Sequence, residues 1–327
     1  MSPHAHRSRG AALLAAMLTV TLVASFAATA LWQQWRAVEI ESAERSRVQA
    51  AWILTGALDW ARLILREDGR SGGADHLAEP WAVPLQEARL SSFLAADKNN
   101  SASDSASSPL DIFLSGQIED MQSRLNVTNL TDANKVSEPD LISFTRLFDL
   151  LGLPQGELLT LAGNLRLAGD TSPDKRSGAS VPLMPQRLEQ LVWLGLSQAT
   201  LARLRPHISL LPTRTPVNLN TASAEVIYAS IPGVEMAQAQ RLADERSRSH
   251  FRTLSDASRL IGDSDGRISE GQHSVTTRFF QVRGRLRMER TLIEERSLVQ
   301  RDGLTVKTLW RERAALDPLP ATAQSLQ

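Results

Sequence analysis

The sequence predicts an α+β protein in which a long N-terminal helix packs on an antiparallel sheet and a large all-α domain is inserted between the strands. Three observations predict this fold: an uncharged apolar run that continues into an amphipathic helix, alternating strand patterns early and late in the chain, and capped helical patterns between them. The 327 residues, of which 42 % are hydrophobic, suffice for a buried core in one large domain or two small ones.

The composition excludes several classes of protein and site. Lys and Arg number 36 and so do Asp and Glu, so the net charge of zero argues against a chain that binds polyanions over its whole surface. Local basic patches remain compatible with it. The absence of cysteine excludes disulfides, thiolate metal sites and cysteine nucleophiles.

The N-terminus carries an apolar segment of membrane-spanning length. Residues 11–31 contain no charge, proline or glycine, and a helix of that length spans about 31 Å, close to the roughly 30 Å of the hydrocarbon core. Basic residues precede it, the first acid is Glu39, and Trp32 and Trp35 follow it. Because basic flanks stay in the cytoplasm, we expect a single-pass inner-membrane protein with its C-terminal bulk in the periplasm.

Three fates of this segment are compatible with the sequence. A signal peptidase would cut after the small-x-small triplet Ala28-Thr29-Ala30, although the apolar run is longer than usual for a signal peptide. The segment could stay as an uncleaved anchor. Cleavage on the cytoplasmic side, between Gly10 and Ala11, would leave the whole apolar helix on the mature protein. A short basic leader, a glycine and then an apolar helix resembles the type IV prepilin leader.

The helical pattern continues beyond the membrane segment. Residues 32–66 contain no proline, and apolar residues recur at three- and four-residue spacing on one stripe: Ala51, Leu54, Leu58, Ala61 and Leu65. We expect one helix over residues 11–66, with 11–31 in the membrane. A membrane rod whose distal half packs on a globular head is typical of pilins, and the alternative is an anchor joined to a separate juxtamembrane helix.

The head is expected in two parts, residues 67–130 and 269–314, followed by a flexible tail at 315–327. Its predicted strands cover residues 89–95, 111–119, 276–286, 289–299 and 304–311. Asp302-Gly303 is a hairpin signal between the last two strands. The Ser-rich stretch 97–108 has no apolar period and predicts a mobile loop.

The inserted domain is expected at residues 131–268. Its predicted helices cover 139–168 with a break at Gly152-Leu153-Pro154, 188–204 with a break near Gly195, a segment from a cap at Thr221 or Ser223 to Ser230, residues 235–248, and a segment from a Thr253–Asp256 capping box to Gly262. An insertion of this size would clash inside a helical filament, because a filament subunit has neighbours on every side. It therefore favours a subunit at the tip.

Four stretches, in this order, resemble the general secretion pathway protein K family (GspK), the large minor pseudopilin of the type II secretion system. They are RGAALLAAMLTVTLVA at the leader, GQIEDMQSRLNVTNL at 116–130, FTRLFDLLGL at 144–153 and PVNLNTASAEVIYASIPGV at 216–234. The resemblance implies a pilin-like fold with an inserted domain similar to SAM and helix-hairpin-helix modules. It also implies a subunit that caps the pseudopilus tip, helps to initiate it and assists protein export across the outer membrane. Competence or type IV pilus assembly is a neighbouring possibility.

The resemblance assigns roles to three residues and names partners. A prepilin peptidase would remove the leader, residues 1–10, by cutting after Gly10, and would methylate the new terminus at Ala11. Most pilins carry a glutamate at the fifth mature position, where it neutralises the terminal ammonium of a neighbour; here that position is Ala15. Since a buried unpaired carboxylate is costly, Ala15 suits a tip subunit with no neighbour above it. The implied partners are the minor pseudopilins I, J and H.

The main alternative is a membrane-anchored helix-hairpin-helix DNA-binding protein. Residues 217–262 also resemble such a module, which binds phosphate through backbone N–H groups of a Gly-rich hairpin. However, Pro232-Gly233-Val234 is followed by Glu235, and Gly262 by Asp263, so each hairpin carries a carboxylate that repels phosphate. The nearby Arg241, Arg246, Arg248 and Arg252 are interpreted as solvated helix charges. No nucleic acid is expected as a partner.

Enzyme and metal signatures are weak. The sequence contains no Gly-rich nucleotide loop, HExxH or GxSxG motif, and its histidines are scattered singly. We therefore expect no catalytic residues, no cofactor and no assignable metal. Asp263, Asp265 and Glu270 form a loose oxygen-donor cluster without EF-hand spacing, so an acidic turn is the favoured interpretation. Some relatives carry calcium in the inserted domain, and calcium remains possible here without assignable ligands.

Overall fold

The computed structural model describes residues 8–95, 112–170, 182–263, 265–288 and 291–316. The chain divides into two compact units, residues 1–56 and 57–327. Helix α1 (Ser8–Ser71) runs through the first unit into the second and is longer at both ends than the predicted 11–66. It ends where Gly72 adopts a φ of 66°, which favours glycine over any residue with a Cβ.

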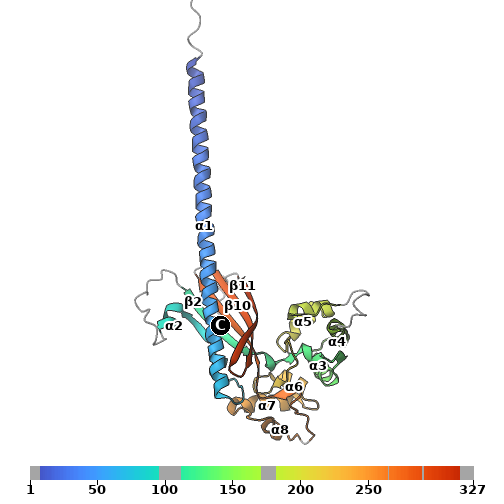
Figure 1. Cartoon of the computed structure of the whole chain (residues 1–327). Coiled ribbons are helices and arrows are strands. Elements are labelled where there is room, and N and C mark those ends of the chain that lie inside the picture. The colour runs from blue at the N-terminus through green and yellow to red at the C-terminus, as the bar shows by residue number, and fades with distance from the viewer. Residues whose placement is uncertain (1–7, 96–111, 171–181, 264, 289–290, 317–327) are drawn as a thin grey trace, which may run out of the picture. The chain divides into compact units, whose positions relative to one another are not determined.

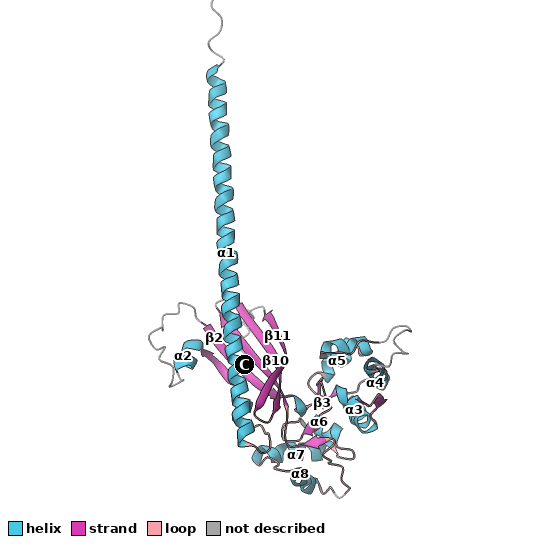
Figure 2. Cartoon of the chain, in the orientation of Figure 1, coloured by secondary structure: helices cyan, strands magenta, loops and turns pink. Residues whose placement is uncertain are grey.

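The second unit contains a five-stranded antiparallel sheet with strand order β1-β2-β9-β10-β11 (Figures 1 and 2). The strands are β1 (Leu85–Arg89), β2 (Ile112–Asp120), β9 (Phe279–Met288), β10 (Thr291–Asp302) and β11 (Thr305–Leu316). The hairpin between the last two turns at Gly303, with a φ of 58°. Because β2 pairs with β9, the early and late parts of the head form one sheet, as predicted.

One face of this sheet is covered by residues 57–71 of α1. Leu58, Ala61 and Leu65 pack with Phe280 and other buried residues of the strands. Trp81, from the 3-10 helix η1 (Pro80–Ala82), closes this core edge-on against Phe280, with ring centroids 5.2 Å apart. Burial of each such side chain stabilises the fold by roughly 1.5–3 kcal/mol.

The inserted domain is a lobe of short helices, and among the described residues its hydrophobic core is larger than that under α1. Its helices are α3 (Glu138–Leu150), α4 (Gln155–Gly169), the 3-10 helix η6 (Leu188–Leu194), α5 (Gln198–Leu204), α6 (Ala224–Ser230), α7 (Met236–Arg248) and α8 (Leu254–Ile261). The predicted breaks at Gly152 and Gly195 are present, and of the two candidate caps Ser223 caps α6. Thr253 and Asp256 form the predicted capping box.

Short strand pairs that no sequence pattern predicts belong to the lobe. They are β3 (Leu125–Asn126) with β6 (Ile208–Ser209), β4 (Thr131–Asp132) with β5 (Lys135–Val136), and β7 (Val217–Asn218) with β8 (His273–Ser274). Two further 3-10 helices, η3 (Met121–Ser123) and η4 (Val127–Leu130), complete the passage from β2 into the lobe. The first and third pairs are parallel and join segments far apart in the chain.

Two sequence predictions are wrong. Residues 90–95, predicted as part of a strand, form helix α2 (Leu90–Ala95), and the strand lies before them as β1. A short apolar run does not distinguish a strand from a helix, and here pairing with β2 ends at Arg89. The tail was expected to begin after Ala314, but β11 pairs with β10 up to Leu316. The predicted loop at 97–108 and the rest of the tail lie outside the described residues.

Candidate functional site

The N-terminal part of α1 exposes an apolar surface. Among the described residues, one helix is long and apolar enough to cross a membrane, and it covers Gly10–Ser71. Its large apolar side chains from Leu13 to Trp35 are all more than half exposed. A surface of this kind is stable in lipid or against partner helices, because both are apolar.

The three residues predicted to direct processing and placement lie at the start of this surface. Gly10, Ala11 and Ala15 are all helical and exposed. Since Ala11 and Ala15 are four residues apart, they lie one above the other on the same helix face. A terminal ammonium at Ala11 would therefore share a face with the side chain at position 15.

The polar side chains inside the apolar segment satisfy their own hydrogen bonds. Each hydroxyl donates to a carbonyl three or four residues earlier: Thr19 to Ala16 at 2.8 Å, Thr21 to Leu18 at 2.9 Å, Ser25 to Thr21 at 2.8 Å and Thr29 to Ser25 at 2.8 Å. In hydrocarbon an unsatisfied hydroxyl costs several kcal/mol, so this arrangement suits a membrane-spanning helix.

The end of β2 is joined to the inserted domain by a buried carboxylate. Asp120 accepts hydrogen bonds from the Gln122 N–H at 2.7 Å, Thr277 Oγ1 at 2.6 Å, Asn218 Nδ2 at 3.0 Å and Thr221 Oγ1 at 2.6 Å. Burial raises the pKa of Asp120, and these donors oppose that shift. Gln122 is local, whereas the other three donors come from two distant segments, 218–221 and 277, so one side chain joins three parts of the chain.

A second buried cluster lies beside it. Arg301 on β10 forms ion pairs with Asp68 of α1 and with Asp75. Asp75 also accepts a 2.7 Å hydrogen bond from the Thr277 N–H. Burial raises the pKa of Asp75 while Arg301 opposes that shift. This network ties the end of α1 to the last long strands of the sheet.

Two asparagines of the stretch 116–130, one of the four that carry the family resemblance, have structural roles. Asn126 accepts from the Leu211 N–H at 3.1 Å and donates to the Thr213 carbonyl at 2.8 Å. Asn129 exchanges two hydrogen bonds with the backbone of Thr215, at 2.8 and 3.0 Å. Buried amides of this kind fix loops that regular strands do not pair.

In the two hairpins that resemble a DNA-binding module, the carboxylates Glu235 and Asp263 form local interactions with neighbouring residues. The Glu235 carboxylate and Gln238 form a capping box at the start of α7. Asp263 accepts from the backbone N–H groups of Arg267 at 3.1 Å and Ile268 at 2.9 Å. Each hairpin therefore carries a carboxylate held in its own turn, and a negative charge at this position disfavours phosphate.

The arginines near these hairpins do not form one solvated cluster. Arg246 is half-buried, donates to the Leu219 carbonyl at 2.5 Å, and has its pKa lowered to about 10 by this partial burial. The interpretation of Arg246 as a solvated charge is wrong, because its guanidinium is hydrogen-bonded to the Leu219 carbonyl of another segment of the domain. Arg248 is exposed and pairs with Glu245 at 3.5 Å.

Two of the histidines are not isolated. His76, after α1, stacks on His250, after α7, with ring centroids 3.8 Å apart.

A third histidine, His273, is buried, and its Nε2 lies 3.2 Å from the Ser230 carbonyl oxygen. Burial lowers the pKa of His273 to about 4, so the ring is neutral at physiological pH.

The predicted acidic cluster of Asp263, Asp265 and Glu270 lies after α8. Asp263 is bound by Arg267 and the backbone, as an acidic turn requires. Among the described residues, the acids whose oxygens lie within 4.8 Å of one another are Asp68, Asp75 and Glu79. Arg301 already supplies positive charge to two of these three.

Comparisons with known proteins match both parts of the inserted domain. Two models of the family described as type II secretion system protein K match residues 123–213 and 217–276. A type II secretion system protein K from Pseudomonas aeruginosa is 29 % identical over 324 residues, covering 92 % of this chain and 88 % of the relative. One from Pectobacterium carotovorum is 24 % identical over 336 residues, covering 94 % and 96 %.

A solved structure shares the fold. It is a chain of the GspK-GspI-GspJ complex from the type 2 secretion system of enterotoxigenic Escherichia coli, with a TM-score of 0.65 and 19 % identity. The similarity covers 83 % of this chain and 98 % of that one. It confirms the α+β prediction for the head and the inserted domain.

Proposed function

Because the chain belongs to the type II secretion system protein K family, we propose that it is the minor pseudopilin that caps the tip of a type II secretion pseudopilus. The observation that carries this proposal is the union of an exposed apolar helix with a large lobe inserted between β2 and β9. The helix supplies the means of assembly. The lobe makes an internal filament position unfavourable, because an internal subunit must fit between neighbours on all sides.

The proposed partners are the minor pseudopilins I and J, together with H. One solved structure with this fold is from a complex of GspK with GspI and GspJ. In the same arrangement here, α1 would pack against partner helices through its apolar surface, and the tip complex would initiate the pseudopilus and assist export across the outer membrane.

The chain is anchored in the inner membrane by its one N-terminal helix, with the bulk outside. We propose that a prepilin peptidase cuts between Gly10 and Ala11 and methylates the Ala11 amine. The protein is a secretion component, and we propose that it has no catalytic residues and needs no cofactor for assembly. Calcium in the inserted domain stays a proposal without assigned ligands.

The intact mass and N-terminal sequence of the protein extracted from membranes of its own host test this proposal. We expect a terminus at Ala11 with one added methyl group, and co-purification of the other minor pseudopilins. A terminus at Leu31 would mean that signal peptidase cut after Ala30 and would overturn the pilin-type processing. An intact Met1 would leave a plain anchored protein and would equally contradict it.

A further inference from the structure

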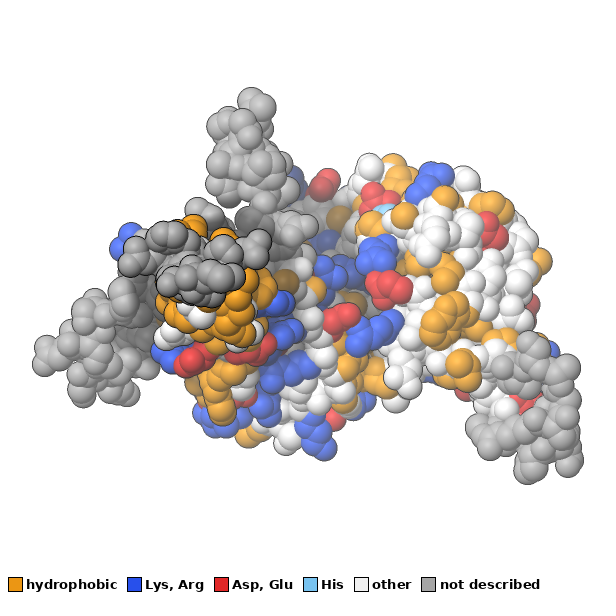
Figure 3. Space-filling model, turned by 90° about the horizontal axis from the view of Figure 1, so that it is seen from above, with side chains coloured by type: hydrophobic (Ala, Val, Ile, Leu, Met, Phe, Trp, Pro, Cys, Tyr) orange, Lys and Arg blue, Asp and Glu red, His pale blue; other side chains and the backbone are white. Residues whose placement is uncertain are grey.

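The face of the sheet opposite residues 57–71 of α1 carries a row of arginines. Along β9, Phe280 and Val282 point into the core under α1, so Arg283, Arg285 and Arg287 point to the other side. We call this side the open face and define it by Gln117, Glu119, Arg283, Arg285, Glu294 and Arg296. Figure 3, seen from above, shows many blue side chains in the half of the molecule that holds the sheet and fewer on the helical lobe.

The arginines of the open face exceed its carboxylates. Glu119 lies between Arg124, at 2.9 Å, and Arg283, at 3.6 Å. Glu294, which is almost fully buried, lies between Arg285 and Arg296, both at 2.6 Å. The open face therefore holds three arginines against two glutamates, which leaves one unbalanced positive charge, and Arg124 beside Glu119 adds a second at its edge.

Arg283 has unused hydrogen-bonding capacity. Its Nε is buried and has no acceptor among the described residues. Its distance of 3.6 Å from Glu119 is too long for a hydrogen bond. A buried donor without an acceptor costs roughly 1–3 kcal/mol, and the Arg283 side chain is 28 % exposed, so a carboxylate that reaches its guanidinium could offset part of this cost.

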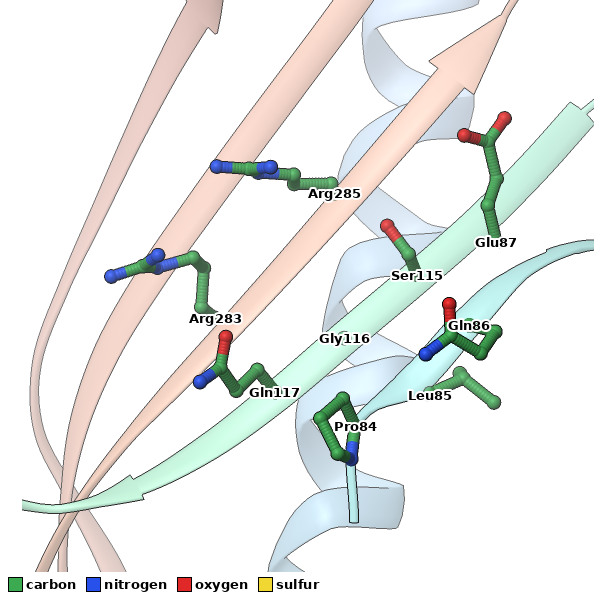
Figure 4. Close-up of a pocket in the computed structure, with 9 residues that line it drawn as sticks. All are labelled: Pro84, Leu85, Gln86, Glu87, Ser115, Gly116, Gln117, Arg283 and Arg285. Atoms are coloured by element: carbon green, nitrogen blue, oxygen red, sulfur yellow. The ribbon is translucent and has the colours of Figure 1, made fainter. Parts of the chain in front are cut away.

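Two hollows meet at Arg283. One, of about 260 Å³, is lined by Gln117, Ser115 and Arg285 from neighbouring strands (Figure 4). The other, of about 230 Å³, lies between the sheet and the lobe and is lined by Leu298 and Trp310. Both hollows include Arg283 in their lining, and we call them together the groove. The second hollow also holds two glutamates, Glu189 and Glu312, which are paired with Arg205 and Arg187.

We propose that the open face binds an extended acidic segment of a protein outside the pseudopilus. Residues 283, 285 and 287 alternate along one strand, so their Cβ atoms repeat at about 7 Å, which matches alternate side chains of an extended peptide. Arginine and carboxylate groups form charge-assisted hydrogen bonds, which are roughly twice as strong as hydrogen bonds between neutral groups. The location outside the filament rests on the proposed function, since residues 57–71 of α1 would then face the other subunits.

The test uses the full-length protein in detergent micelles and a fluorescent eight-residue peptide in which glutamate alternates with serine. We expect binding by fluorescence anisotropy that weakens as salt rises. Arg283→Gln should weaken binding about tenfold or more. Glu119→Gln should tighten binding several-fold, because it releases two arginines. Arg278→Gln, which breaks an exposed pair with Asp302 away from the groove, should leave the affinity unchanged.

Several results would overturn the inference. An unchanged affinity in both Arg283→Gln and Glu119→Gln would place the peptide elsewhere. Equal, Arg283-dependent binding of duplex DNA or of anionic phosphatidylglycerol vesicles would show a general anion surface instead. Absence of peptide binding by the wild type would also refute it. The N-terminus at Ala11 and the co-purifying pseudopilins are measured separately, so failure of the peptide assay leaves the proposed function standing.

Discussion

Asn218 Nδ2 donates a 3.0 Å hydrogen bond to the Asp120 carboxylate, although 98 residues of chain separate the two. Asp120 ends a strand of the head, and Asn218 belongs to the short strand β7 of the inserted domain. The same Asn218 side chain donates to the Asp75 carbonyl at 3.1 Å. The junction between sheet and lobe is therefore a buried polar network, and its geometry needs an acceptor at position 120.

Asp120→Asn should destabilise the protein by about 3 kcal/mol. The substitution puts an NH₂ donor against donors that now point at two carboxylate oxygens, so at least one buried donor loses its acceptor. The measurement is chemical unfolding followed by circular dichroism on the full-length protein in micelles. Glu270→Gln, at an exposed turn, is the control and should change the stability by less than about 0.5 kcal/mol. Equal stability of the two variants would contradict the junction role.

Gly69→Ala should destabilise the protein by about 2 kcal/mol, although alanine favours helices. A Cβ at this position in α1 would lie 2.8 Å from the Gly303 carbonyl oxygen, in the hairpin between β10 and β11. Backbone cannot move aside as a side chain can, so the helix and the hairpin must separate.

Gly163→Ala in α4 is the matched control, because nothing lies within 4 Å of its Cβ. It should stabilise the protein by roughly 0.5–1 kcal/mol through helix propensity alone. Thermal unfolding of both variants separates the two effects. A stabilised Gly69→Ala variant would show that α1 and the hairpin are not in close contact.

The sequence was sufficient for the long elements and insufficient for the junction. The apolar run of α1, the helix breaks at Gly152 and Gly195, and the hairpin at Gly303 each depend on a local pattern, and all were predicted. The short strand pairs were not, because two-residue strands have no detectable period. The hydrogen bonds of the junction, such as the one between Asn218 and Asp120, join residues far apart in the chain, so no local pattern predicts them.

The misread residues illustrate the same limit. Arg246 occupies a polar position of an amphipathic helix, which predicts solvent, yet its guanidinium reaches a carbonyl of a distant loop. His76 and His250 appear isolated along the chain and are stacked in space. An amphipathic pattern predicts which face of a helix is polar, but it does not predict which distant segment packs on that face.

Acid should destabilise the inserted domain through His273. Burial holds the pKa of this ring at about 4 in the folded state, against about 6.5 in an unfolded chain. The folded state therefore disfavours the charged ring: the stability is fully present above pH 6.5 and is lost as the pH falls toward 4. The difference corresponds to about 3 kcal/mol.

His273→Gln should remove this dependence, so the wild type should lose about 3 kcal/mol more than the variant between pH 7 and pH 4. Unfolding curves at a series of pH values give the comparison. His250→Gln is the control, because that ring is far less buried than His273. If the two wild-type-minus-variant profiles coincide, His273 is not the group that titrates.

Ala15→Glu should move the protein away from its tip position without preventing membrane insertion. A glutamate here would lie on the same helix face as Ala11 and would seek the terminal ammonium of a neighbouring subunit, which an internal subunit has and a tip subunit lacks. Ala16→Glu is the control, because it adds the same charge about 100° around the helix. We expect reduced co-purification of the minor pseudopilins and reduced secretion for Ala15→Glu, relative to Ala16→Glu at equal membrane content. Unchanged assembly and secretion would show that position 15 does not determine the place of the subunit in the pseudopilus.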